Sequence, residues 1–151
     1  LINMYRYLPN TVTVHGETKE RHSASIFGHC LTSDFSMDEW APYDEAVREA
    51  VGVDFEMIYV RLLKYSRTCF MQSHTDNSYE KPWQPPQDLS IIIQLNDPSE
   101  YEGGRLIVDG EDSNLQQGDI IVWSYDLGIP HEITTVTKGK RYSMNLRGKL
   151  C

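Results

Sequence analysis

A chain of 151 residues is long enough for one domain with a hydrophobic core of its own. The formal net charge is −8, and an acidic surface repels phosphate backbones, so general binding of nucleic acid is disfavoured. Three widely spaced cysteines argue against a disulfide framework and favour a reducing, cytoplasmic compartment. No apolar run reaches the roughly 20 residues of a membrane span, and no signal peptide is visible, so no membrane partner is expected.

The clearest helical signal lies in the N-terminal third. Ser36 is followed three residues later by Glu39, which is the pattern of a capping box. Apolar residues then recur on one helical face, at Trp40, Tyr43, Val47 and Val51. Gly52 is a suitable stop. Pro42 lacks an N–H, so it either begins the main helix at its first turn or kinks it.

After Gly52 the pattern becomes that of short β-strands separated by turn signals. The predicted strands lie at 57–65, 88–96, 104–108, 119–125, 131–136 and 140–146. The last two flank a turn at Lys138-Gly139 and are expected to form a hairpin. Six or more short strands favour a mainly β sandwich or jelly roll over a βαβ fold. We expect a single domain over 1–151, with a helical support region at about 1–56 and a β core at about 57–147.

A histidine and an aspartate stand two residues apart in QSHTDNS, residues 72–78, at the end of a β-prone run. Side chains at i and i+2 of a strand share one face, so His74 and Asp76 can converge on one ion. Two ligands hold a metal poorly, and His131, which follows Pro130 and opens a predicted strand, is the candidate third. Two histidines and a carboxylate form the facial triad of non-haem Fe(II) oxygenases. An isolated H-x-D arises often by chance, so the downstream context decides its weight.

That context includes a candidate carboxylate clamp. Arg141 lies ten residues after His131, in the second strand of the expected hairpin. A guanidinium can bind a carboxylate through two parallel hydrogen bonds, and Ser143 shares the face of Arg141 and can add a hydroxyl. Three metal ligands and an anion clamp therefore occur in one chain.

The order His74-Thr75-Asp76, then His131, then Arg141 resembles the 2-oxoglutarate and Fe(II)-dependent dioxygenases. Three further segments resemble the prolyl 4-hydroxylase-like branch: LNDPSEYEGGRLIV (95–108), LQQGDIIVW (115–123) and PHEITTVTKGKRYSMNL (130–146). The resemblance extends from about Tyr59 to Leu146. It implies a double-stranded β-helix, which is a cupin-like jelly roll, with iron bound at its open mouth.

The same resemblance implies roles for individual residues. His74, Asp76 and His131 would be the catalytic Fe(II) ligands, and Arg141 would bind the distal carboxylate of 2-oxoglutarate. O₂ would be the second co-substrate, and ascorbate a stimulant. Tyr65 lies near the place of a tyrosine that contacts the co-substrate in relatives, although a core aromatic is an equal alternative.

Three positions bear on the details of the co-substrate pocket. Tyr59 is a weaker rival of Tyr65 for the co-substrate contact. Ile93 stands where some relatives have a co-substrate tyrosine, and Arg105 stands where many have an acidic or polar residue. These departures leave the three predicted iron ligands in place.

A proline-rich loop, NSYEKPWQPPQD (77–88), follows the H-x-D stretch directly. Its prolines cannot pair in a sheet, and Tyr79 and Trp83 have no evident core to join. One hypothesis makes the loop a lid over the substrate, and the other makes it a plain connector.

Three functions fit the sequence. The first is hydroxylation of a C–H bond in a protein or peptide side chain, with prolyl as one candidate, or in a small molecule, with release of succinate and CO₂. The second is a nucleic-acid or nucleotide oxygenase, because Arg147 follows Arg141 with the R-x5-R spacing of a demethylase branch. A basic groove beside the iron would support it. The third is a non-enzymatic, cupin-like metal-binding module, which leaves Arg141 and Ser143 without a role.

Overall fold

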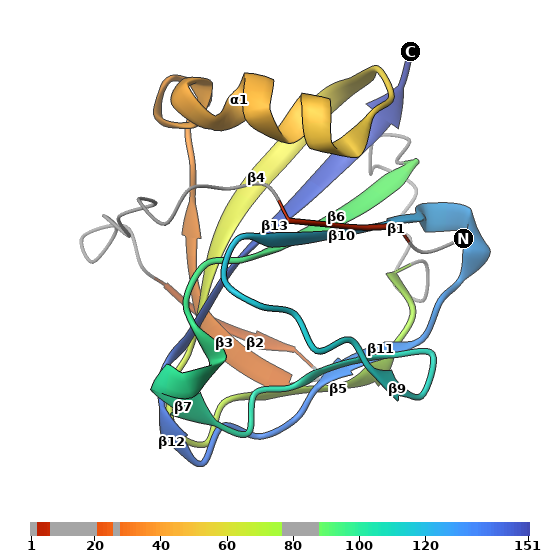
Figure 1. Cartoon of the computed structure of the whole chain (residues 1–151). Helices are drawn as coiled ribbons and strands as arrows, with labels where there is room; N and C mark the ends of the chain where they lie inside the picture. Colours follow the sequence, from red (N-terminus) through yellow and green to blue (C-terminus); the bar gives the residue numbers. More distant parts are fainter. Residues whose placement is uncertain (1–2, 7–20, 26–27, 77–87) are drawn as a thin grey trace.

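The structure is a computed structural model that describes residues 3–6, 21–25, 28–76 and 88–151. It is mainly β-strand, with one α-helix lying across the outside of a strongly bent sheet (Figure 1). The strands are β1 (Asn3–Arg6), β2 (Arg21–Ser25), β3 (Gly28–Asp34), β4 (Phe55–Tyr65), β5 (Phe70–His74), β6 (Leu89–Gln94), β7 (Tyr101–Glu102), β8 (Leu106–Val108), β9 (Glu111–Asp112), β10 (Asp119–Ser124), β11 (His131–Ile133), β12 (Lys138–Gly139) and β13 (Arg141–Leu150). The helices are α1 (Met37–Val51) and the short 3₁₀ turns η3 (Pro98–Glu100) and η4 (Tyr125–Leu127).

The strands form two facing layers. Along one sheet the order is β1-β10-β6-β13-β4-β3-β5-β11-β8-β9, with β2 beside β3, while β7 and β12 form a separate pair. In Figure 1 the layer of β6, β13 and β4 lies under α1, and β5 and β11 lie in the layer below it. This arrangement is a jelly roll, and the mainly β fold class predicted from the sequence is confirmed.

Alternation along the upper layer separates two hydrophobic cores. Side chains at alternate positions of β4, β6 and β13 pack against α1 in a first core, as Leu62, Ile91 and Leu146 do with Trp40 and Val47. The other face of the same strands points between the two layers. A second core there contains Leu63, Ile92 and Trp123, and the polar side chains of the inner face lie beside it.

The helix begins and ends where its sequence predicts. Ser36 is the N-cap, and its Oγ accepts a hydrogen bond of 3.2 Å from the Glu39 N–H. Gly52 ends the helix with φ at +79°, a left-handed conformation that favours glycine. Pro42 lies inside the helix rather than at its start, so the prediction that it begins the main helix is wrong.

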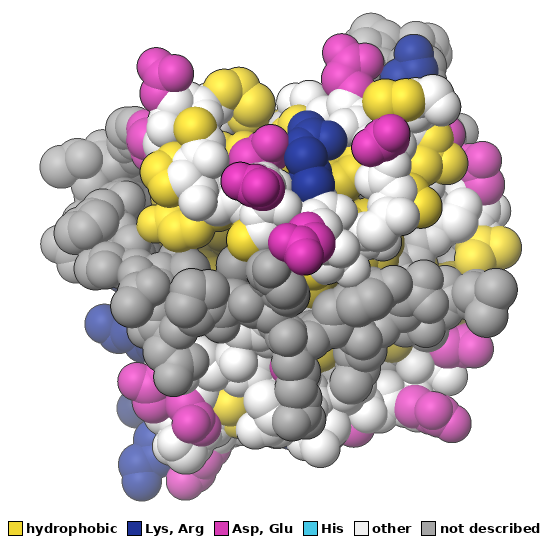
Figure 2. Space-filling model, turned by 45° about the horizontal axis from the view of Figure 1, so that its top comes forward, with side chains coloured by type: hydrophobic (Ala, Val, Ile, Leu, Met, Phe, Trp, Pro, Cys, Tyr) yellow, Lys and Arg dark blue, Asp and Glu magenta, His cyan; other side chains and the backbone are white. Residues whose placement is uncertain are grey.

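Acidic side chains outnumber basic ones on the face that carries α1 (Figure 2). Among the described residues, no helix has both the length and the apolar character that a membrane crossing requires.

The predicted hairpin of 131–136 with 140–146 is wrong. Strand β11 pairs with β5 and β8, whereas β13 pairs with β4 and β6, because the chain passes from one layer to the other between them. The expected turn at Lys138-Gly139 is instead β12, which pairs with β7. The region N-terminal to 57 also contributes β1, β2 and β3, which the sequence did not predict.

Candidate active site

Three side chains that can hold a metal meet where β5 and β11 lie side by side. His74 ends β5 and His131 begins β11, and the two residues are register partners although 57 positions separate them in the chain. Asp76 follows two residues after His74. The ligand atoms of this His-Asp-His cluster (His74, Asp76 and His131) all lie within 4.8 Å of one another. The structure therefore brings together the three residues that the sequence singled out.

Both imidazoles are held by the backbone. The Nδ1 of His74 lies 2.8 Å from the Gln72 carbonyl oxygen, and the Nδ1 of His131 lies 3.0 Å from that of Ile129. With a proton on each Nδ1, the Nε2 atoms present lone pairs toward Asp76. Burial lowers the pKa of His74, which favours the neutral imidazole that binds metals.

The Asp76 carboxylate is oriented by three neighbours. Its Oδ1 lies 3.0 Å from Arg147 Nη2 and 3.3 Å from His131 Nε2, and its Oδ2 accepts a 2.5 Å hydrogen bond from Ser90 Oγ. Burial opposes ionisation, but the Arg147 charge and the hydrogen bond from Ser90 outweigh it, so the pKa of Asp76 lies below its usual range. The carboxylate is anionic at neutral pH, as a metal ligand must be.

A buried arginine at the beginning of β13 faces the same cavity. Arg141 is 1% exposed. Its Nε donates to Gln94 Oε1 at 3.1 Å and its Nη1 to Ser143 Oγ at 3.4 Å, while Nη2 is buried with no hydrogen-bond partner among the described residues. A buried guanidinium left one donor short is unusual. A carboxylate placed there would complete its hydrogen bonding, so the residues present fit 2-oxoglutarate as well as iron.

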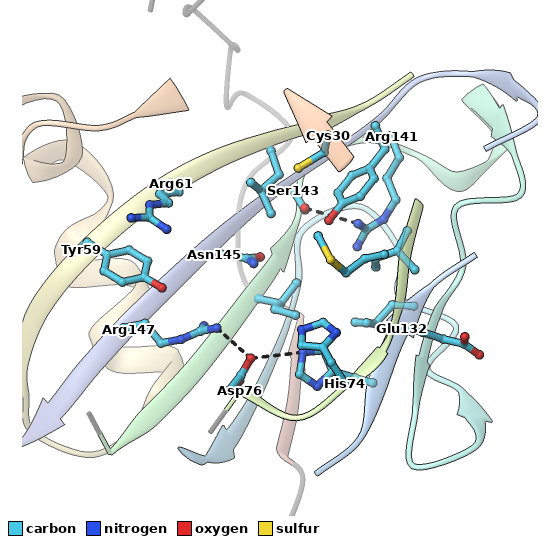
Figure 3. A pocket seen from close by; sticks show the side chains of 17 residues that line it. Cys30, Tyr59, Arg61, His74, Asp76, Glu132, Arg141, Ser143, Asn145 and Arg147 are labelled. Atoms are coloured by element: carbon cyan, nitrogen blue, oxygen red, sulfur yellow. Dashed lines mark hydrogen bonds and ion pairs between the residues drawn. The ribbon is translucent and has the colours of Figure 1, made fainter. Parts of the chain in front are cut away.

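The cavity between these features has a volume of about 180 Å³ and two distinct ends (Figure 3). Arg141, Tyr65 and Ser143 define one, which we call the Arg141 end. Tyr59 and Arg61 line the other, which we call the Arg61 end, and the His-Asp-His cluster forms the floor between them.

The structure assigns clear places to the residues on which the sequence left alternatives open. Tyr65 is the register partner of Arg141, whose guanidinium carbon lies 5.5 Å from the tyrosine ring centroid. Burial is the main cause of the raised pKa of Tyr65, so its phenol stays neutral and can donate a hydrogen bond. Tyr59 lies at the Arg61 end, 5.9 Å from the Arg147 guanidinium carbon.

Two other predicted positions lie away from the site. Ile93 packs in the core under α1, and its neighbour Gln94 is the residue that reaches Arg141. Arg105 forms an ion pair of 2.8 Å with Asp112 on the surface. The two aromatics of the predicted lid, Tyr79 and Trp83, lie outside the described residues.

Sequence reasoning missed several residues of the inner face. Ser90 and Gln94 occupy alternate positions of β6, opposite the apolar face that the sequence did reveal. Asn145 and Arg61 likewise line the cavity, from β13 and β4. The alternation of side chains along a strand could have revealed such residues. If β13 is continuous, for example, Arg147 must lie on the same strand face as Arg141.

Comparison with known proteins assigns the class. Residues 60–146, more than half of the chain, match the family model of the 2OG-Fe(II) oxygenase superfamily. The chain belongs to this superfamily. Two solved structures share the fold: an oxidoreductase of the 2OG-Fe(II) oxygenase family from Burkholderia pseudomallei (TM-score 0.63, 15% identity, 86% of this chain and 72% of that one) and a prolyl-4-hydroxylase from Pseudomonas putida (TM-score 0.62, 18% identity, 85% and 76%).

More similar sequences exist among curated proteins. A PKHD-type hydroxylase from Picosynechococcus sp. (strain ATCC 27264 / PCC 7002 / PR-6) is 39% identical over 72 residues, which is 45% of this chain and 31% of the relative. A PKHD-type hydroxylase from Psychrobacter sp. (strain PRwf-1) is 37% identical over 79 residues, which is 47% of this chain and 30% of the relative. The matches thus span less than a third of the length of these relatives.

Proposed function

We propose that the chain is an Fe(II)- and 2-oxoglutarate-dependent oxygenase that hydroxylates a C–H bond of its substrate. One observation carries the proposal: a buried arginine with an unpartnered Nη2 faces the same cavity as the His-Asp-His cluster. An isolated metal site would not need a buried cation at that place. A metal site and an anion clamp in one cavity suit a chelating co-substrate that is itself a dicarboxylate.

In this mechanism the protein positions its reactants. His74 and His131 would bind iron through Nε2, and Asp76 through a carboxylate oxygen held by Arg147 and Ser90. The bound metal and co-substrate would supply the oxidising chemistry, which consumes O₂ and 2-oxoglutarate and releases succinate and CO₂.

At the Arg141 end, Arg141 would bind the distal carboxylate of 2-oxoglutarate through its Nη2. Ser143 would add a hydroxyl and Tyr65 a neutral phenol. The apolar wall beside them, to which Leu63 and Ile92 belong, would keep water from the reacting atoms.

For the substrate class, a protein or peptide side chain is supported by the named relatives. These are PKHD-type hydroxylases in sequence and a prolyl-4-hydroxylase in fold. A prolyl residue and a small molecule are both compatible with the site. The demethylase alternative rested on the spacing of Arg141 and Arg147, and the ion pair of Arg147 with Asp76 gives that spacing a role within the protein.

The test is a succinate assay on the wild-type chain with Fe(II) and 2-oxoglutarate, supplied with pools of peptides, nucleotides and metabolites. We expect iron-dependent succinate release that one pool stimulates and that His131→Ala abolishes. Calorimetry of Fe(II) and 2-oxoglutarate binding supplies a second readout. If wild-type protein shows no 2-oxoglutarate binding in the presence of Fe(II), the proposed function is wrong.

A further inference from the structure

A buried glutamine in the middle of the sheet orients the Arg141 guanidinium. Gln94 is the last residue of β6, and its Oε1 accepts the 3.1 Å hydrogen bond from Arg141 Nε. Its Nε2 donates at 2.9 Å to the Asn96 carbonyl oxygen and at 2.8 Å to Tyr101 Oη. A guanidinium only donates hydrogen bonds, so the amide oxygen has to face it. The two bonds from Nε2 therefore fix the one orientation of the Gln94 amide that supports Arg141.

The tyrosine at the other end of this network is held by close contacts with two glycines. Gly139 is the register partner of Tyr101 in the β12–β7 pair, and a Cβ on Gly139 would lie 2.9 Å from Tyr101 Cα. A Cβ on Gly104 would lie 3.3 Å from two ring carbons of the same tyrosine. Both glycines belong to segments with the family resemblance, and the proposed mechanism gives neither a role. Their contacts fix the place from which Tyr101 reaches Gln94.

The backbone of Arg141 is fixed separately, by Asn96. This residue lies two positions after β6, and its Nδ2 donates at 2.8 Å to the Lys140 carbonyl oxygen. Its Oδ1 accepts a hydrogen bond of 2.8 Å from the Tyr142 N–H. Asn96 thus binds the backbone on both sides of Arg141, while Gln94 binds the side chain.

The guanidinium also has little space on the side that faces Tyr101. A second cavity, lined by Arg141, Gln94, Tyr101 and Gly104 among others, has a volume of only about 10 Å³. That is room for no more than one water molecule, so the guanidinium has no space into which it could retract. Hydrogen bonds and close packing together hold it at one depth in the main cavity.

We propose that Gln94 and Tyr101 are positioning residues for the co-substrate: by fixing the depth of Arg141 they set the length of the 2-oxo dicarboxylate that the cavity accepts. The proposal rests on the proposed function, in which the metal and Arg141 bind opposite ends of this acid. Since the fold fixes both ends, an acid with one more methylene group cannot reach both well. An arginine without such support has many rotamers and would adapt to acids of different lengths.

The experiment compares 2-oxoglutarate with 2-oxoadipate, which is longer by one methylene group. Each protein is loaded with Fe(II) without O₂, and calorimetry gives the Kd for each acid. Tyr101→Phe removes only the hydroxyl that accepts from Gln94, and Gln94→Met removes the amide with little change in volume.

Two variants are matched controls. Tyr142→Phe removes a hydroxyl from the neighbour of Arg141, whose side chain packs with the core under α1 on the other face of the sheet. Gln117→Met removes an amide that donates at 3.2 Å to the Leu95 carbonyl oxygen and has no bond to Arg141. Both controls should keep the wild-type Kd values.

We expect the wild-type chain to bind 2-oxoglutarate about 10-fold to 200-fold more tightly than 2-oxoadipate. In Tyr101→Phe and Gln94→Met the Kd for 2-oxoglutarate should rise about twofold to tenfold, because one neutral hydrogen bond that orients Arg141 is lost. The Kd for 2-oxoadipate should rise less, so the ratio of the two Kd values should fall. A merely structural role would change both Kd values alike and leave the ratio as it is. The affinity for Fe(II) should not change.

Three results would overturn the inference in a wild-type chain that binds Fe(II) and 2-oxoglutarate. These are equal wild-type affinity for the two acids, an unchanged ratio in Tyr101→Phe, and a ratio that falls as far in the controls as in the two test variants. Should Gln94→Met not fold, Tyr101→Phe decides, because it removes a single oxygen atom. A wild-type chain that binds no 2-oxoglutarate with Fe(II) present overturns the proposed function instead, and this inference with it.

Discussion

Replacing Arg141 by methionine separates the co-substrate role of this residue from any role in the fold. Methionine keeps much of the side-chain volume in a site that is 1% exposed, but it removes the charge and every donor. In the absence of co-substrate the arginine is only partly satisfied. It makes one bond of 3.1 Å to Gln94 and a longer one of 3.4 Å to Ser143, and Nη2 makes none.

The expected magnitude follows from these contacts. Breaking a buried, hydrogen-bonded charge pair costs about 2–5 kcal/mol, so the Kd for 2-oxoglutarate should rise roughly 30-fold to 4,000-fold. Stability should respond far less. The variant loses a buried unsatisfied donor but leaves Gln94 Oε1 without its partner, and each such group costs about 1–3 kcal/mol. The free energy of unfolding should therefore change by less than about 2 kcal/mol.

Two measurements on the same protein check this prediction. Calorimetry in the presence of Fe(II) gives the Kd for 2-oxoglutarate, and urea denaturation without ligands gives the free energy of unfolding. Arg141→Lys should restore part of the affinity, because an ammonium is a point charge without the planar fork. A methionine variant that binds 2-oxoglutarate as tightly as wild type would refute the assignment and direct attention to Arg147 or Lys140.

Three further outcomes are expected. Alanine at any one of the three proposed iron ligands should abolish tight Fe(II) binding, and iron titration with wild-type affinity in any two of these variants would contradict the assignment. The ionised Asp76 stabilises the fold above its unfolded-state pKa of about 4, and this contribution is lost as the pH falls toward the lower folded-state pKa. Arg147→Met should therefore reduce the difference in unfolding free energy between about pH 7 and about pH 3, measured with urea. Gly103→Ala should destabilise the fold by more than about 1–2 kcal/mol. The φ of Gly103 is +73°, and a Cβ at this position would lie 2.0 Å from the Thr135 carbonyl oxygen. Gly110→Ala is the control, because Gly110 has a similar φ of +80° but no atom within 4 Å of the new Cβ. Equal thermal stability of the two variants would contradict the steric argument.

The local features of the fold were accessible from the sequence. The cap at Ser36, the stop at Gly52 and the alternation of β6 depend on neighbouring residues, so short-range patterns predict them. Short-range patterns could not predict the strands with which β11 and β13 pair. Their separation into two layers depends on partners far along the chain, and a turn signal at Lys138-Gly139 is equally compatible with a hairpin.

The site shows the same division. His74, Asp76, His131 and Arg141 were singled out because their residue types and order suit iron and 2-oxoglutarate chemistry. Arg61, in contrast, belongs to a strand that looks apolar, and only the register of β4 against β13 brings it into the cavity.

Strand β13 has hydrogen-bonded neighbours on both edges, and it presents Arg141, Ser143, Asn145 and Arg147 on one face. At about 3.3 Å per residue, the Cα atoms of Arg141 and Arg147 are roughly 20 Å apart. Changes in loop length elsewhere cannot alter this spacing, whereas one residue inserted within the strand would turn part of the set toward the helix. The strand thus fixes the distances between the side chains that it contributes to the cavity. A substitution at position 145 therefore changes the middle of the cavity lining, whereas substitutions at positions 141 and 147 change its two ends.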